Sequence, residues 1–142
     1  MGRCYNSAII NAPCDQVWQA ISDFHDFSWA QGVITSVEKV GPLAGNQIGA
    51  RRLLNDAFYE TLVSFDGRER SFSYSIDDGP EPISKHSVKN YLGRVRVAPV
   101  TGNDTTFIEW ESTYDAKDDP AVGEFCNPIY QALLDALQKR FA

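Results

Sequence analysis

Apolar and polar residues alternate along the middle of the chain, which is the pattern of β-strands with one buried face. Turn-forming pairs such as Asp66-Gly67 and Gly102-Asn103 separate the alternating segments. The strands predicted in this region are residues 47–54, 57–65, 70–77, 88–97 and 105–115. No helical pattern lies between them, so the sheet should be antiparallel, because parallel neighbours need a long crossover.

One face of the later strands carries large side chains, and the other carries serine, arginine and glutamate. The residues predicted to point inward are Phe72, Tyr74, Ile76, Tyr91, Val95, Val97, Thr106, Ile108, Trp110, Ser112 and Tyr114. The opposite face is predicted to meet water. A sheet with one wet face buries the other against a second layer.

The N-terminal part of the chain predicts two short helices between two strands. The elements expected there are a strand over residues 4–11, a helix over 14–22, a second short helix, and a strand over 33–40. Pro13 suits the first turn of the first helix. Asp23 is the candidate N-cap of the second, which would contain Phe24, Phe27 and Trp29.

The C-terminal segment predicts the covering layer. From Val122 to Phe141, apolar residues recur at helical spacing over twenty positions, with Asp119 as candidate N-cap and Pro120 as first helical residue. Pro128 should kink or restart this helix. The order of elements predicts an α+β fold, a curved antiparallel sheet wrapped around one long helix, in a single domain over residues 1–142.

Charge and cysteine usage narrow the classes of partner and compartment. The 142 residues carry 13 Lys+Arg against 19 Asp+Glu, a net charge of −6, which argues against binding nucleic acid or anionic membranes. No apolar run is long enough to span a bilayer. Cys4, Cys14 and Cys126 are odd in number and widely spaced, which indicates reduced thiols and predicts a cytoplasmic protein.

A metal site has little support in the sequence. The two histidines, His25 and His86, lie in polar segments. His25 with Asp23 and Asp26 is a conceivable cluster, but a zinc site uses three or four convergent ligands and polar loop residues are usually only solvated. We expect no metal and no cofactor.

The inward positions are unusually rich in aromatic residues with polar tips: Tyr74, Tyr91, Trp110 and Tyr114, with Tyr130 of the C-terminal segment as a further candidate. An ordinary core of this size favours leucine, isoleucine and valine. Such a wall suits a cavity with an apolar body and a few polar groups. A solid core whose hydroxyls reach the rim explains the pattern equally well, so the residues alone leave both open.

The order of elements and several residue groups resemble the helix-grip superfamily, also called SRPBCC or START-like. Within it, the chain is similar to the polyketide cyclase/dehydrase type and to plant lachrymatory-factor-synthase-like proteins. The resemblance covers nearly the whole chain, and its motifs are weak singly but fairly specific in this order. They are Ala12-Pro13, Val17-Trp18, Asp23-Phe24, Trp29, Gly49-Ala50-Arg51-Arg52, Glu60, Leu62, Phe65-Asp66, Ser73-Tyr74-Ser75-Ile76, Tyr91, Arg94-Val95-Arg96-Val97-Ala98-Pro99 and Ile108-Glu109-Trp110.

The resemblance implies a hydrophobic tunnel between helix and sheet for a small apolar or aromatic ligand. It implies a charged pair for proton transfer, and Arg52 and Glu60 fall at the matching positions, although Arg51 beside Arg52 leaves the choice of arginine open. The short hairpin between them departs from the family pattern and bears on the depth of the pocket. The expected ligand-binding residues are Tyr74, Tyr91, Trp110, Tyr114, Phe125 and Ile129.

The alternation in residues 57–65 opposes this assignment. Tyr59, Thr61, Val63 and Phe65 form the more apolar face, which places Glu60 outside as one half of a surface ion pair. An odd loop length, or a bulge at Gly67, would reverse the register and bring Glu60 inside. Both alternatives follow from the sequence.

Three functions remain in view. The first is an enzyme that binds a small hydrophobic or polyketide-like molecule and catalyses metal-free cyclisation, dehydration or isomerisation with Arg52 and Glu60. A buried glutamate near an arginine can act as a general acid or base. The others are a non-catalytic carrier or sensor of such a ligand, and a protein-interaction module. A homodimer is left open.

Overall fold

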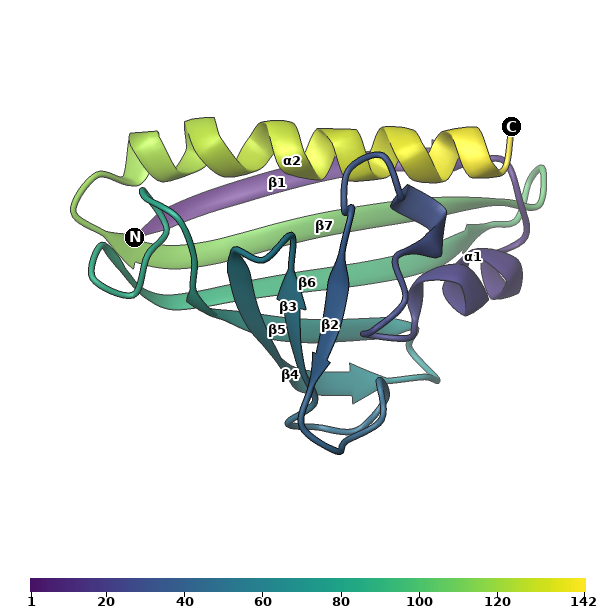
Figure 1. Cartoon of the computed structure of the whole chain (residues 1–142). Helices are drawn as coiled ribbons and strands as arrows, with labels where there is room; N and C mark the ends of the chain where they lie inside the picture. Colours follow the sequence, from purple (N-terminus) through teal and green to yellow (C-terminus); the bar gives the residue numbers. More distant parts are fainter.

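The computed structural model describes residues 1–142 as one curved sheet beneath a long helix (Figure 1). In chain order the elements are β1 (Gly2–Ile10), α1 (Cys14–Ile21), the single 3-10 turn η1 (Ser28–Ala30), β2 (Val37–Val40), β3 (Arg51–Leu54), β4 (Phe58–Asp66), β5 (Ser71–Asp78), β6 (Val88–Val100), β7 (Thr105–Ala116) and α2 (Asp119–Arg140). The seven strands are antiparallel in the order β1-β7-β6-β5-β4-β3-β2. This confirms the α+β helix-grip architecture.

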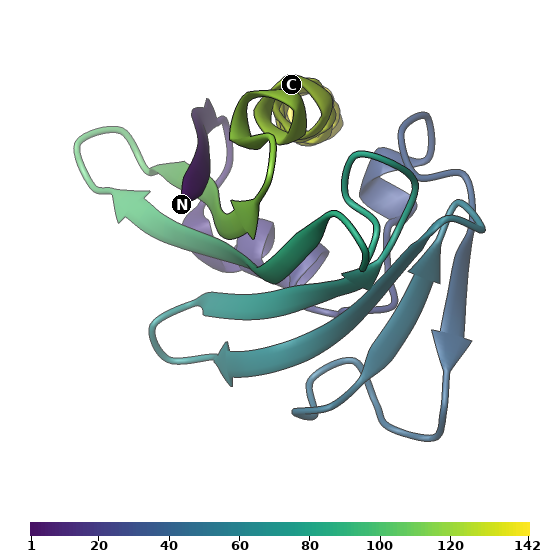
Figure 2. The ribbon, with the colours of Figure 1, turned by 90° about the vertical axis from the view of Figure 1, so that its left-hand side faces the viewer.

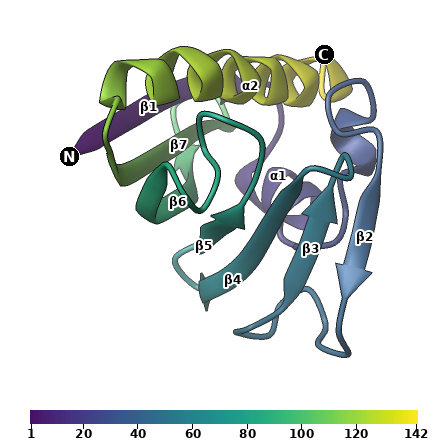
Figure 3. The same cartoon turned by 60° about the vertical axis from the view of Figure 1, so that its left-hand side comes forward.

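The sheet bends around α2. Figure 2 looks along the helix, with β1 beside it and the sheet curving underneath toward β2 and β3 on the other side. Figure 3 shows β2, β3 and β4 side by side at the edge of the sheet remote from β1. The concave face and the underside of α2 therefore enclose one interior, in which a core of 30 buried apolar residues gathers.

The period-two pattern of β7 sets which residues enter that interior. Thr106, Ile108, Trp110, Ser112 and Tyr114 are all at most 3% exposed. Neighbouring positions on the same strand, such as Glu109 and Glu111, lie on the outer face and pair with arginines of β1 and β6. The predicted faces of β6 and β7 are therefore confirmed.

The second predicted helix and two strand starts are corrected. The Asp23 carboxylate accepts a hydrogen bond from the backbone N–H of His25 instead of capping a helix, and only η1 follows it. The backbone N–H of Ile34 bonds to Ala30, so this turn extends beyond η1 and β2 begins at Val37 rather than at residue 33. Gly49 has a φ of +92°, and β3 begins after it rather than at residue 47.

Two details of α2 also differ from expectation. The N-cap is Asp118, whose carboxylate accepts from the backbone N–H of Ala121 at 3.1 Å, one residue before the predicted Asp119. The helix does not restart at Pro128. Pro128 and Glu124 are both exposed, so the carbonyl that loses its partner can meet solvent. None of the helices combines the length and apolar composition that a membrane span requires.

Candidate functional site

A β-bulge in β4 decides the orientation of Glu60. Asp66 pairs with Ser71, so the loop has four residues, and without a bulge Val63 would face Tyr74. Instead Val63 has no partner and Leu62 pairs with Tyr74. Glu60 is consequently 5% exposed and Val63 is 45% exposed. The apolar-face prediction is wrong here, and the reversal of register occurs inside the strand rather than at Gly67.

The same bulge lets β4 turn side chains inward on both sides of Val63. Beyond Val63, Phe65 turns inward and its ring lies 5.5 Å from that of Trp18 on α1. Before it, Glu60 turns toward the interior beneath α2. Because of this one extra residue, β4 contacts α1 through Phe65 and faces the interior beneath α2 through Glu60.

Arg52 and Glu60 are cross-strand partners on β3 and β4. Arg52 Nε lies 2.9 Å and Nη2 lies 2.6 Å from the same oxygen, Glu60 Oε1. Both side chains are nearly fully buried, with 3% and 6% exposure. Arg51 is exposed, so the structure places Arg52, not Arg51, in the interior.

Aromatic rings and a carbonyl hold the guanidinium in place. Arg52 Nη1 donates to the backbone carbonyl of Phe24 at 2.9 Å. The guanidinium carbon lies 3.7 Å from the ring centre of Phe24, 4.8 Å from that of Phe27 and 5.4 Å from that of Tyr74. These contacts suit a planar cation and fix its position.

The Glu60 carboxylate has one oxygen committed and one free. Oε1 takes both bonds from Arg52, whereas Oε2 accepts no hydrogen bond from the protein and is accessible from the cavity. Burial raises the pKa of Glu60 above its ordinary value, and the charge of Arg52 opposes that rise. The group is therefore suited to exchange a proton with a molecule beside Oε2.

A chain of buried hydroxyls begins at Tyr74, whose ring also faces the Arg52 guanidinium. Trp110 Nε1 donates to Tyr74 Oη at 2.9 Å, Tyr74 and Tyr130 are joined at 3.2 Å, Tyr130 bonds to Tyr91, and Tyr91 donates to Ser112 at 3.0 Å. Burial raises the pKa of the three tyrosines well above that of a free phenol, so they stay protonated at neutral pH.

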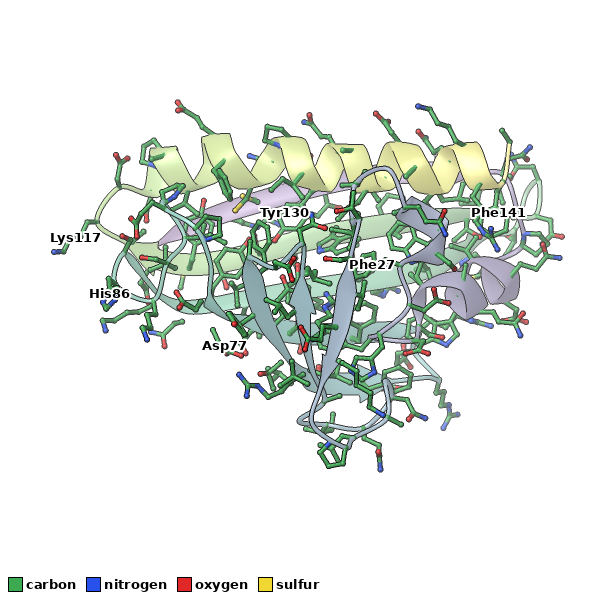
Figure 4. The ribbon with its side chains drawn as sticks, viewed as in Figure 1. Phe27, Asp77, His86, Lys117, Tyr130 and Phe141 are labelled. Atoms are coloured by element: carbon green, nitrogen blue, oxygen red, sulfur yellow. The ribbon has the colours of Figure 1, made fainter.

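A narrow cavity connects the ion pair to the hydroxyl chain. Its lining residues are Phe27, Ile34, Arg52, Leu54, Phe58, Glu60, Tyr74, Ile76, Trp110, Cys126, Ile129, Tyr130 and Leu133. Figure 4 shows Tyr130 on the sheet side of α2 and Phe27 below the helix. The space open to the centres of water molecules is about 40 Å³, room for about three waters. A ring-sized ligand therefore needs lining side chains to move, and the half-buried ones among them are Phe58, Ile76 and Ile129.

Comparison with known proteins places the chain in a family. The sequence profile of the family described as polyketide cyclase / dehydrase and lipid transport matches residues 1–142. The chain belongs to this family.

Several solved structures share the fold. A protein from Nitrosospira multiformis is 43% identical, with a TM-score of 0.96 over 99% of this chain and 96% of that one. The protein XoxI from Bacillus cereus is 29% identical, with a TM-score of 0.80 over 99% and 96%. Norcoclaurine synthase from Thalictrum flavum, solved with dopamine and hydroxybenzaldehyde, shares the fold at 18% identity, with a TM-score of 0.70 over 96% and 84%. The comparison with curated proteins gave no match.

Within this cyclase/dehydrase-family chain, five of the residues expected from the sequence line the cavity: Arg52, Glu60, Tyr74, Trp110 and Ile129. The other three lie behind or beside it. Tyr91 reaches the cavity through its hydrogen bond to Tyr130, and Tyr114 stacks behind Tyr91 with ring centres 5.5 Å apart. Phe125 stacks on Phe58, 6.3 Å between centres.

Eight further residues line the cavity and are not among the ligand-binding residues expected from the sequence. They are Phe27, Ile34, Leu54, Phe58, Ile76, Cys126, Tyr130 and Leu133. Tyr130 and Leu133 share a helix face with Ile129 and Cys126, so the helical period of α2 pointed to them. Ile34 gave no signal, because it follows a 3-10 turn rather than lying in a strand.

The loop cluster around His25 is explained by local structure. His25 Nε2 lies 2.9 Å from the backbone carbonyl of Arg51, and Asp23 and Asp26 bond to backbone N–H groups of their own loop. These contacts tie the loop to the start of β3, next to Arg52.

Proposed function

We propose that this protein binds a small hydrophobic or aromatic carbonyl compound in the cavity and catalyses proton transfer on it. The observation that carries the proposal is the free oxygen of a buried glutamate, Glu60 Oε2, facing the cavity beside a fixed cation. Outcomes of such transfer are isomerisation, dehydration and aldol-type cyclisation.

Each partner has a defined role. Glu60 removes a proton from the carbon next to the carbonyl, and negative charge develops on the carbonyl oxygen. Arg52 still has two of its five N–H groups uncommitted and can stabilise that charge. Glu60 then returns the proton to another carbon, or gives it to a departing hydroxyl. No metal is needed, because Arg52 supplies the positive charge.

The comparisons support this class of chemistry. The family description names cyclases and dehydrases. The structure of norcoclaurine synthase with two aromatic compounds shows that the shared fold can hold aromatic ligands.

Deuterium exchange tests the proposal without the natural substrate. We expect the protein to accelerate exchange of the methyl protons of acetophenone in deuterium oxide, followed by NMR. Glu60→Gln should reduce the enzymatic rate by about 10²–10⁴-fold, the usual contribution of a positioned acid or base. The exposed Glu124→Gln removes the same charge and should leave the rate unchanged. Unchanged exchange in Glu60→Gln, or none above background in the wild type, contradicts the proposal.

A carrier of a hydrophobic molecule is the second candidate. It is favoured by the lining, since 11 of the 13 cavity residues are hydrophobic, and by the family description, which includes lipid transport. Binding of aromatic compounds without any exchange would support the carrier over the enzyme.

A further inference from the structure

We infer that the cavity selects an uncharged ligand that donates an O–H hydrogen bond to Glu60, as a phenol or an enol does, and excludes the matching carboxylate. The inference rests on the proposed function only in placing the ligand in the cavity. It adds the chemical class of the ligand's polar end, which neither the family description nor the apolar lining specifies.

The first argument is a charge count. Arg52 and Glu60 are the only ionisable pair in the lining that carries charge, and they neutralise each other at 2.6 Å. A ligand carboxylate would add an unpaired charge to an apolar cavity. Even seated on the free N–H groups of Arg52, it would lie beside the carboxylate of Glu60, which shares the same guanidinium. Like charges at that range repel strongly where water is scarce.

The second argument is a proton count along the hydroxyl chain. Each hydroxyl has one proton to donate. Tyr91 gives its proton to Ser112, so Tyr130 must donate to Tyr91, and Tyr74 must donate to Tyr130. Trp110 in turn donates to Tyr74. All three phenol protons are therefore committed within the protein, and none is offered to a ligand.

In contrast to the phenols, which have no proton left to donate, the Glu60 carboxylate can still accept a hydrogen bond from a ligand. Glu60 Oε2 is a charged acceptor with no donor from the protein. A ligand O–H satisfies it, whereas an ether oxygen or a carboxylate presents a second acceptor to it. Buried polar groups left unpaired discriminate more strongly than extra apolar contacts do. The best match for Glu60 Oε2 is one neutral O–H donor on a flat apolar body, which a phenol supplies and which a carbonyl compound supplies in its enol form.

Three compounds with one ring each separate the possibilities: phenol, anisole and benzoate. We would measure their dissociation constants for the wild-type protein near neutral pH by calorimetry or ligand-observed NMR. Phenol should bind about 10-fold or more tightly than anisole, the effect of one hydrogen bond to a charged group. Phenol should also bind more tightly than benzoate, by a factor at least as large.

Replacing the Glu60 carboxylate with a neutral amide should change the relative affinities of the three compounds. In Glu60→Gln the charge of Arg52 is no longer balanced, so benzoate should gain affinity and the advantage of phenol over anisole should fall to a few-fold. Glu124→Gln, on the exposed side of α2, is the matched control and should keep the wild-type order. If Glu60→Gln does not fold, the wild-type series decides alone.

The outcomes are distinct from those of the exchange experiment. Equal binding of phenol and anisole, preferred binding of benzoate, or no binding of any compound up to about 10 mM overturns the inference. Selective phenol binding without exchange of acetophenone leaves the inference standing and removes the catalytic proposal. If acetophenone exchange depends on Glu60 but anisole binds as tightly as phenol, the catalytic proposal stands and the inference on the ligand's O–H group is overturned.

Discussion

Removing one partner of the Arg52–Glu60 pair should cost far more stability than removing both. Arg52→Met leaves a buried carboxylate without its cation, and Glu60→Leu leaves a buried guanidinium without its anion, since both side chains are at most 6% exposed. Breaking a buried pair in this way costs about 3–5 kcal/mol. If the two effects were independent, the double variant would lose about 6–10 kcal/mol.

The structure predicts a much smaller loss for the double variant. Replacing both members of a buried pair with apolar residues is often nearly neutral. One polar group would still be stranded, because Arg52 also satisfies the carbonyl of Phe24. An unsatisfied buried carbonyl costs about 1–3 kcal/mol. We therefore expect the double variant to lose about 1–3 kcal/mol, less than either single variant.

Urea unfolding followed by circular dichroism measures these differences. With a slope of about 2 kcal/mol per molar urea, the single variants should unfold about 1.5–2.5 M earlier than the wild type. The outer-face pair Arg94 and Glu111 is the control, since it is substantially exposed, at 42% and 27%, and its removal should cost under about 1 kcal/mol. Additive losses, or single variants within about 1 kcal/mol of the wild type, would refute the reasoning.

The Arg52→Met deficit should also depend on pH. Burial raises the pKa of Glu60, and loss of Arg52 removes the effect that opposes the rise. A folded-state pKa above the unfolded value contributes stability that is complete below the unfolded value, about 4.3 for glutamate, and is lost as pH rises through the folded value. The deficit should thus be smallest near pH 4.5, where the stranded carbonyl of Phe24 still contributes, and grow toward neutral pH. A deficit independent of pH would mean that Glu60 is not the source.

Three further perturbations test the framework around the site. Gly93→Ala places a methyl group 2.3 Å from the Tyr74 ring, so it should cost about 1–3 kcal/mol and lower Tm by several degrees, whereas Gly102→Ala, with open space around it, should change Tm little. Asp118→Ala removes the cap of α2 and should cost about 1 kcal/mol by urea unfolding, with Asp118→Ser retaining most of it. Hydrogen bonds from two backbone amides lower the pKa of Asp78, so the stability they give is present at neutral pH and lost as pH falls through the lowered value. The protection of those amides against hydrogen exchange, relative to their intrinsic rate at each pH, should therefore fall in acid, and Asp78→Asn should reduce it already at neutral pH.

The outer framework of the fold was predictable because its signals are periodic. On β7, five consecutive inward positions follow a period of two, and each is buried as predicted. On α2, the helical period identified the face that covers the sheet. Many positions share each period, so the element can be recognised even where one residue, such as Pro128, departs from the pattern.

The candidate site was only partly predictable because a single residue reverses its strand. Tyr59 and Val63 are 40% and 45% exposed, although they belong to the apolar alternation of β4. Glu60 is buried because of the bulge at Val63, and a bulge leaves no period in the sequence. The charged pair was found through the resemblance to a family, and its geometry could be found only from the strand register. The hydroxyl chain likewise needs three strands and α2 to be assembled first.

Arg52 and Glu60 are charged residues in a position where a stable core would have apolar ones. Apolar side chains of similar volume would be as stabilising as the Arg52–Glu60 pair or more so, since a buried ion pair is weak evidence for stability. Yet a bulge turns Glu60 inward, and aromatic rings and a backbone carbonyl hold Arg52 in place, while Glu60 Oε2 has no partner in the protein. Local departures from the stable choice are expected at functional sites. The protons of the hydroxyl chain are all committed within the protein, and the uncommitted N–H groups of Arg52 belong to nitrogens that already make a hydrogen bond. Glu60 Oε2 is therefore the side-chain oxygen of this cavity that has no partner in the protein and can gain one from a ligand.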